Sequence, residues 1–388
     1  MSNQRRDNLA RMVEGRWSIG VTGTHGRATV SSMVAWILEC AGLHPGFAIT
    51  ARAENFGRKS SKGKGRWMVA ELDERAAEHH RIHCDYVVCS FLEVDPRDYY
   101  QGMGDIVDAM SRFLESNRSL KEAFVNLDCQ GNRQLVRRAP LRPTGYAMQH
   151  RAEFRGELGK TSDQNVEFSA YHRDQKIGDF QLGIPGAYNA VNALGAIAVT
   201  YRMGIAIEVV ADALESYAGM ENRNIVSRGG GVVFIKDFDR HPAGVQRVID
   251  MARGLADGRM IIAFEPDSKM LSASFRRRYE AAFAGSDEVF VTEFPGESPG
   301  DEAVGSVEAL VEGFEARGLQ TTTISAVETL DEAIVSTAGK GDKIVFLGGD
   351  RLLRRADHIQ AELASRAAQT PAEGDQPRFD GPLADTGE

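Results

Sequence analysis

The sequence predicts an α/β protein in which a parallel-sheet mononucleotide-binding domain is followed by a smaller Rossmann-like α/β domain. The first observation is the length of 388 residues, which exceeds what one hydrophobic core usually organises. The second is that short apolar runs alternate with longer helical stretches, and that this alternation restarts after Gly219. We therefore expect the two domains at residues 1–220 and 221–366.

The first domain opens with a strand, a turn and a helix. The run from Trp17 to Thr22 has the pattern of a short buried strand, and the apolar-periodic run from Thr29 to Ala41 predicts a helix. Residues 168–182 have the pattern of polar hairpin strands, which we interpret as an edge insertion, and the Ala-rich residues 189–204 predict another helix. Further strands, separated by stretches long enough for crossover helices, are predicted at Trp67–Ala70, Tyr86–Cys89 and Phe124–Leu127.

The second domain repeats the alternation. Five apolar runs predict its strands, at Val232–Ile235, Met260–Phe264, Glu288–Thr292, Thr321–Ile324 and Lys343–Leu347. Residues 367–388 are rich in Pro, Gly and polar side chains and too poor in apolar ones to fold, so we expect a disordered acidic tail there.

Composition narrows the function classes. Four cysteines lack a Cys-x-x-Cys spacing and no signal peptide opens the chain, which indicates the cytoplasm. No apolar run is long enough to span a bilayer, so we expect no membrane insertion. A formal net charge of -9 argues against general nucleic-acid binding, which normally requires a basic surface.

A phosphate-binding loop is predicted between the first strand and helix, at Gly23-Thr-His-Gly-Arg-Ala-Thr-Val30. Backbone N–H groups and the positive end of a helix can bind phosphate oxygens in this context, whereas the alternative is a plain tight turn. A usual loop ends in Gly-Lys-Ser/Thr, but here Arg27 and Ala28 take the last two positions, so the metal-binding hydroxyl is absent. The candidate nucleotide-binding residues are Gly23, Thr24, His25, Gly26, Arg27 and Thr29.

Several ordered motifs between Arg11 and Leu363 resemble the Mur ligase family. The phosphate loop and the start of the following helix match that family's ATP loop, apart from Arg27 and Ala28. The other matching segments are Val69–Glu74, Leu92–Tyr100, Pro185–Asn192, Arg223 and Ile235–Pro242.

This resemblance implies roles for individual residues. Glu71 would bind Mg²⁺ and Asp237 would meet the ribose of ATP. Asn189 and Asn192 would contact adenine. The candidate catalytic residues are Arg27, Arg223, which would approach the γ-phosphate, and His241.

The chain also departs from the family pattern. Pro96 replaces a metal-binding histidine and Ala28 lacks a hydroxyl, so we expect a weakened Mg²⁺ site supplemented by Asp73, Glu74, Asp95 or water. The substrate-contacting Asn-Ala-Arg segment is replaced near a basic run, Arg58 to Arg66, which we expect to be a mobile surface loop. The family's N-terminal domain, which holds the uridine nucleotide, is expected to be absent. Three further histidines are expected on a solvated helical face rather than in a metal site: His79, His80 and His83.

The resemblance implies an ATP-dependent, ADP-forming ligase that joins a small-molecule carboxylate to an amino acid through an acyl phosphate. Because of the departures, we expect a substrate other than the standard cell-wall precursor. One alternative is a catalytically impaired family member that binds nucleotide or a partner protein. Another is a subunit for which a partner protein supplies the missing recognition domain or metal ligands.

Overall fold

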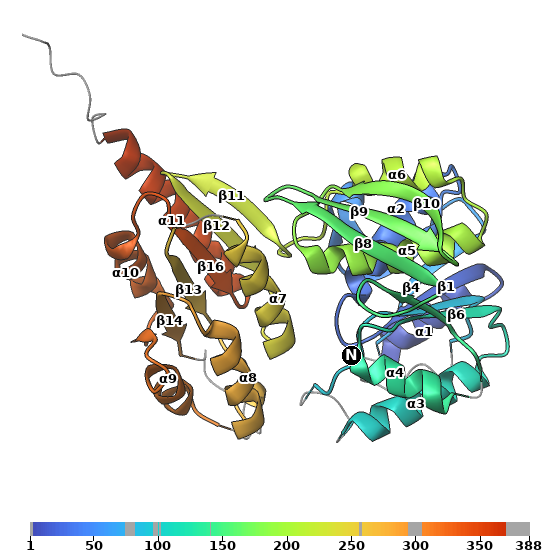
Figure 1. Cartoon of the computed structure of the whole chain (residues 1–388), viewed down its shortest axis with the longest axis horizontal. Coiled ribbons are helices and arrows are strands. Elements are labelled where there is room, and N and C mark those ends of the chain that lie inside the picture. Colours follow the sequence, from blue (N-terminus) through green and yellow to red (C-terminus); the bar gives the residue numbers. More distant parts are fainter. Residues whose placement is uncertain are drawn as a thin grey trace, which may run out of the picture.

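The computed structural model describes residues 3–73, 82–95, 100, 102–139, 141–255, 258–293 and 305–369. It shows two α/β units placed side by side, with α7 of the second facing the first (Figure 1). The predicted fold class is confirmed. The last helix, α11 (Asp350–Gln369), extends three residues beyond the expected domain end, and the rest of the predicted tail lies outside the described residues.

The first unit is built on a ten-stranded sheet in the order β10-β9-β8-β7-β6-β5-β1-β4-β2-β3. Pairing is parallel from β2 to β8, and both edges are antiparallel, which confirms the predicted edge hairpins at β9 and β10. The strands are β1 (Trp17–Thr22), β2 (Gly46–Ala53), β3 (Arg58–Ser61), β4 (Trp67–Glu71), β5 (Tyr86–Cys89), β6 (Glu122–Asn126), β7 (Thr144–Ala147), β8 (Phe154–Thr161), β9 (Val166–His172) and β10 (Gln175–Leu182).

The basic run from Arg58 was expected to be a mobile loop, and this expectation was wrong for its first four residues. They form the edge strand β3, which pairs antiparallel with β2 through Phe47 and Ser61. Three of its four side chains are exposed, so the strand has almost no apolar pattern that could have predicted it.

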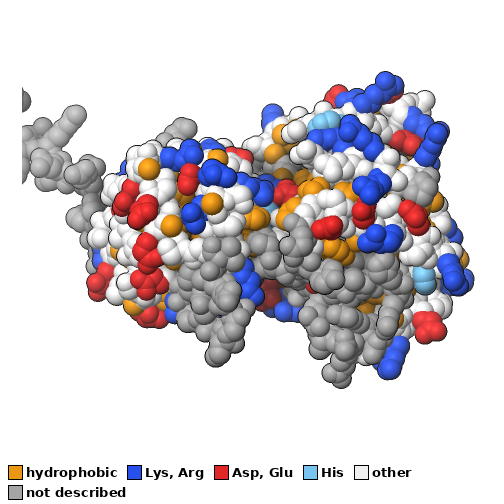
Figure 2. All heavy atoms as spheres, turned by 90° about the horizontal axis from the view of Figure 1, so that it is seen from below, with side chains coloured by type: hydrophobic (Ala, Val, Ile, Leu, Met, Phe, Trp, Pro, Cys, Tyr) orange, Lys and Arg blue, Asp and Glu red, His pale blue; other side chains and the backbone are white. Residues whose placement is uncertain are grey.

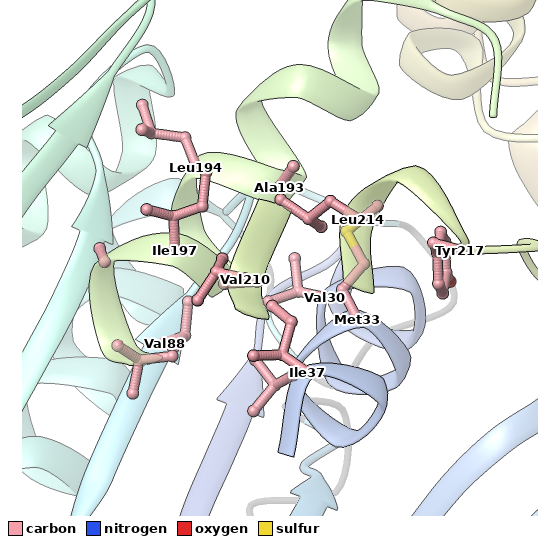
Figure 3. Close-up of a cluster of buried hydrophobic side chains, with 14 of the residues drawn as sticks. Val30, Met33, Ile37, Val88, Ala193, Leu194, Ile197, Val210, Leu214 and Tyr217 are labelled. Carbon is pink, nitrogen blue, oxygen red and sulfur yellow. The ribbon is translucent and has the colours of Figure 1, made fainter. Parts of the chain in front are cut away.

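Helices cover both faces of this sheet. One face carries α2 (Arg27–Cys40), α5 (Ala187–Arg202) and α6 (Ile207–Glu215), and the other carries α1 (Asn3–Val13), α3 (Met103–Ser116) and α4 (Gln130–Arg138). Figure 3 shows the core on the first face, where Val30 and Met33 of α2 lie near Ala193 of α5 and Leu214 beyond it, all fully buried. This packing fixes the start of α2, and therefore the preceding loop, against the sheet.

The second unit has a six-stranded sheet in the order β11-β12-β16-β13-β14-β15, parallel except for β11. Its strands are β11 (Ile225–Gly229), β12 (Val232–Asp237), β13 (Met260–Phe264), β14 (Glu288–Thr292), β15 (Gln320–Ile324) and β16 (Lys343–Leu347). One face is covered by α7 (Pro242–Arg253), α8 (Ala273–Phe283) and α9 (Val307–Glu315), and the other by α10 (Leu330–Thr337) and α11. Short 3-10 turns occur at Glu54–Phe56, Ser268–Met270 and Val327–Thr329.

Charged side chains of both signs are interspersed over the face seen in Figure 2. No helix among the described residues combines the length and apolar character needed to cross a membrane.

Candidate nucleotide-binding site

A cavity of about 360 Å³ lies between the two units. Its volume is within the range of small-molecule sites. The first unit contributes Thr24–Thr29, Thr50, Ala51, Glu71, Tyr188, Asn192 and Met220, and the second contributes Arg223, Asn224, Asp237–Arg240, Gly244, Arg247, Val248 and Asp267. Most of the predicted nucleotide-binding residues therefore come together at one place.

The loop between β1 and α2 has the conformation that its glycines predict. Gly23 and Gly26 have φ angles of +129° and +81°, which residues other than glycine rarely adopt. A Cβ atom at Gly23 would lie 2.7 Å from the carbonyl oxygen of Phe91, and one at Gly26 would lie 2.6 Å from Oδ1 of Asn192. Gly26 precedes α2 without a side-chain cap, so the first-turn N–H groups of the helix remain available to an anion.

The side chain of Arg27 pairs with Glu71, the predicted metal ligand. Its Nε donates to Oε1 of Glu71 at 2.8 Å, and its Nη1 donates to the carbonyl of Gly23 at 2.9 Å. Thr50 donates to the same carboxylate through its backbone N–H at 2.6 Å and through its hydroxyl at 2.8 Å. Both oxygens of Glu71 therefore accept hydrogen bonds already. A metal ion at Glu71 would have to displace Arg27, so the residues as arranged do not fit Mg²⁺ there.

Two carboxylates of the second unit face Arg223. Nη1 of Arg223 lies 3.4 Å from Asp237 and 3.7 Å from Asp239, and the backbone N–H groups of Asn224 and Asp239 donate to Asp237. Burial raises the pKa of Asp237, with Arg223 opposing. Burial acts in the same direction on Asp239, but hydrogen bonding to His25 and nearby guanidinium groups hold the pKa of Asp239 well below its usual range. Asp239 is therefore the more firmly ionised of the two.

The two predicted residues of α5, Asn189 and Asn192, differ in position. Asn192 lines the cavity, and its buried Oδ1 has no hydrogen-bond partner among the described residues. Tyr188 also lines the cavity and donates its hydroxyl hydrogen to Asn224. Asn189 is buried behind this wall, donates to the carbonyl of Pro185 at 2.7 Å and accepts from Asn192 at 3.1 Å. Asn189 thus holds Asn192 rather than facing the cavity.

His241 is also set back from the cavity wall. It is fully buried, and its Nδ1 accepts from the N–H of Ala243, which caps the first turn of α7. Burial, with a further effect from His25, lowers the pKa of His241 to about 3. His25 reaches across from the first unit, and its Nε2 lies 3.0 Å from Nδ1 of His241. The two histidines therefore join the units.

Sequence reasoning missed several residues of this cavity. Arg240 and Arg247 add two guanidinium groups, and the exposed ring of Phe238 lies between Arg223 and Arg240, at 5.8 and 5.7 Å from their guanidinium carbons. Thr50 was missed because its strand, β2, has no clear alternation of apolar residues. Arg240 lies within the matching segment Ile235–Pro242 but was assigned no role, and Arg247 lies inside α7, where no motif marks it.

Some predicted residues lie outside the described ones: Glu74, His79, His80 and Pro96. His83 is described, and its Nδ1 accepts from the backbone N–H of Arg118. Asp73 lies 3.7 Å from Nη2 of Arg27, so its carboxylate helps to stabilise the charge of this guanidinium.

The comparisons with known proteins agree with this architecture. The family model described as the Mur ligase middle domain matches residues 21–200. A UDP-N-acetylmuramate--L-alanine ligase of Rhodospirillum centenum is 30% identical over 370 residues, which cover 93% of this chain and 76% of the relative. That of Geobacter sp. strain M21 is 28% identical over 349 residues, covering 89% and 75%.

Solved structures show the same fold. The UDP-N-acetylmuramate-alanine ligase of Thermotoga maritima superposes with a TM-score of 0.75 at 18% identity, covering 94% of this chain and 78% of that one. The MurF ligase of Thermotoga maritima in complex with ADP gives 0.68 at 17% identity, covering 94% and 86%.

Proposed function

This chain belongs to the Mur ligase family, and from that premise we propose that it is an ATP-dependent ligase with its nucleotide in the cavity between the two units. The carboxylate of one substrate would attack the γ-phosphorus of ATP, forming an acyl phosphate and releasing ADP. The amine of an amino acid would then displace phosphate and form an amide bond. The protein's part in such a reaction is to position the groups and to stabilise the charge on the phosphates.

The observation that carries this proposal is the arrangement of donors around the cavity. The start of α2 and its glycine loop form one wall, and Arg223, Arg240 and Arg247 lie among the residues of the other. Backbone N–H groups and guanidinium groups are the usual partners of phosphate oxygens. The unpaired Oδ1 of Asn192 offers an acceptor to an amino group such as that of adenine, and the exposed ring of Phe238 offers a surface for stacking.

We propose that Arg27 takes over part of the charge neutralisation that a metal provides elsewhere. It is the only residue of the loop with a full positive charge, it contacts Glu71, and Ala28 supplies no hydroxyl. Guanidinium remains charged at any working pH and binds anions through a fixed fork of N–H groups. The weakened Mg²⁺ site stays a prediction.

The same ion pair favours a second candidate function, which is nucleotide binding without turnover. A guanidinium fixed by Glu71 and Gly23 cannot follow the phosphoryl group as it moves. Interactions that are equally strong in the ground state and the transition state give no acceleration. In that case Arg27, Arg223 and His241 only hold the nucleotide and the two units in place, and none of them contributes to a reaction.

The substrates are proposed as a small-molecule carboxylate and an amino acid. The relatives are named for UDP-N-acetylmuramate and L-alanine, so this pair is the first to test, and nothing supports the expected different substrate more strongly. A partner protein that supplies a recognition domain also stays a prediction, without a described surface that requires it.

Calorimetry and phosphate release separate these possibilities. We expect ATP to bind to the full chain, and Arg223→Ala to weaken binding by at least about 10-fold, the scale of a lost charge-assisted hydrogen bond. The matched control is Arg138→Ala, whose guanidinium pairs with Asp108 on the surface and is 61% exposed. Phosphate release that requires both UDP-N-acetylmuramate and L-alanine supports the ligase. ATP binding without release for any acid and amine pair supports the second candidate, and absence of ATP binding at millimolar concentration refutes both.

A further inference from the structure

Three side chains with metal-binding atoms meet where the two units touch. His25 belongs to the phosphate loop, Glu93 follows β5, and His241 caps α7. Nε2 of His25 lies 3.0 Å from Nδ1 of His241, and Oε2 of Glu93 lies 3.9 Å from the same Nδ1. The three ligand atoms all lie within 4.8 Å of one another. Nothing in the proposed nucleotide chemistry uses this cluster as a unit.

The outward nitrogens of both rings have the partners that metal-bound histidines usually have. Nδ1 of His25 faces the carboxylate of Asp239 at 3.7 Å, and Nε2 of His241 lies 3.2 Å from the carbonyl oxygen of Val94. A carboxylate and a backbone carbonyl are the groups that orient a metal-ligating imidazole and raise its basicity. The inward nitrogens, Nε2 of His25 and Nδ1 of His241, face each other, and a metal at Nδ1 would replace the hydrogen bond that this nitrogen accepts from the N–H of Ala243 at 3.2 Å.

A positive ion between the rings would suit this arrangement better than either neutral form of His25. If each outward nitrogen carries its proton toward its oxygen partner, two lone pairs point at each other across 3.0 Å. If instead His25 turns its proton inward, its bare Nδ1 faces the carboxylate of Asp239. A metal ion between the rings would accept both lone pairs and leave the outward N–H of His25 directed at Asp239.

We propose that His25, His241 and Glu93 bind one divalent transition-metal ion of the zinc class, which links the two units. Zinc takes imidazole and carboxylate ligands at about 2.0 to 2.2 Å in a tetrahedron, which places neighbouring ligand atoms roughly 3.3 Å apart. The present separations of 3.0 and 3.9 Å from Nδ1 of His241 bracket that value, and the third pair lies within 4.8 Å, so side-chain shifts of about 1 Å bring the three atoms to a tetrahedral spacing. Two imidazoles favour zinc over magnesium, so this site differs from the family's oxygen-bound metal.

The surrounding charges set how strongly the site can bind. Asp239 and Asp95 add negative charge near the histidines. Arg278 and Arg247 lie 3.1 and 3.7 Å from Glu93 and compete with a metal for its carboxylate. Three protein ligands leave a fourth tetrahedral position, which water from the adjacent cavity can fill because His25 lines it. This proposal does not depend on ligase activity.

The test is zinc binding to the full chain after removal of metals with a chelator. All proteins carry Cys40→Ser, because the exposed thiol of Cys40 could bind zinc adventitiously. His241→Asn removes a ligand but keeps a good helix N-cap, and His25→Ala is a second variant that leaves α7 untouched. His44→Ala is the matched control, since His44 is 57% exposed and lies outside the cluster.

We expect one equivalent of zinc by calorimetry and by elemental analysis, a zinc-induced rise in melting temperature, and visible absorption typical of tetrahedral Co²⁺ after substitution. Each ligand variant should bind zinc at least about 100-fold more weakly, which exceeds the usual effect of removing a residue that only hydrogen-bonds to a metal ligand. Each should also lose the zinc-induced rise in melting temperature. His44→Ala should bind as the parent does. Absence of stoichiometric binding, or one equivalent retained by both His25→Ala and folded His241→Asn, would overturn the proposal.

Discussion

Replacing Arg27 by Ala is expected to destabilise the first unit by about 3 kcal/mol, because it leaves a buried carboxylate unpaired. The Arg27 and Glu71 side chains are 12% and 1% exposed, and their ion pair has an N–O distance of 2.8 Å. Breaking such a pair from one side costs about 3 to 5 kcal/mol. Thr50 still donates two groups to Glu71, so the loss should fall at the lower end.

A double-mutant cycle in urea, followed by tryptophan fluorescence, measures this effect. Arg27→Ala, Glu71→Gln and the double variant should give a coupling energy of about 2 kcal/mol, since the two side chains touch. Arg138→Ala, which removes a surface ion pair, should cost less than about 1 kcal/mol. If Arg27→Ala costs no more than this control, the ion pair with Arg27 does not stabilise the buried carboxylate of Glu71.

Substitution of Arg27 should also change how strongly Mg²⁺ affects ATP binding. We expect Mg²⁺ to add little to the ATP affinity of the natural protein, and the pair Arg27→Lys with Ala28→Thr to increase its contribution by releasing Glu71 and restoring a hydroxyl. Calorimetry with and without Mg²⁺ measures both. Strong Mg²⁺ coupling in the natural protein that survives Glu71→Gln would show that the metal site has been misplaced.

Two other predictions use local geometry. Gly23→Ala should destabilise the chain by about 2 kcal/mol or more, because the positive φ of Gly23 and the carbonyl of Phe91 at 2.7 Å both oppose a Cβ. Gly15 also has a positive φ but has open space around it, so Gly15→Ala should lower the free energy of unfolding by only about 1 kcal/mol. Thermal unfolding compares them, and equal losses would contradict the close approach. At about pH 8 a maleimide should label Cys40 in the folded protein and Cys84 only on unfolding. Burial raises the pKa of both thiols, but Cys40 is exposed, whereas Cys84 is buried and its pKa is raised to about 12, and thiolate is the reacting form. Equal labelling of both in the folded protein, measured by mass spectrometry, would refute this.

The sequence predicted the fold class, the strands with continuous apolar runs and the phosphate loop, because each depends on local patterns. The β1 run, Gly23 and Gly26 all lie within ten residues, and positive φ angles at the two glycines are a property of the residue type. Strands without buried side chains, such as the largely exposed β3 and the half-buried β11, were not predicted, since their pairing rather than their composition makes them strands.

Only the tertiary structure decided which residues the phosphate loop contacts. Parallel pairing of β1 with β4 places Val21 beside Glu71, and this register brings a carboxylate 44 residues away within reach of Arg27. The contact between His25 and His241 joins residues 216 apart. No pattern along the chain encodes such pairs, because they depend on strand order and on the packing of two units. Whether a charged side chain binds a ligand or a neighbouring residue is therefore determined by what the fold places beside it.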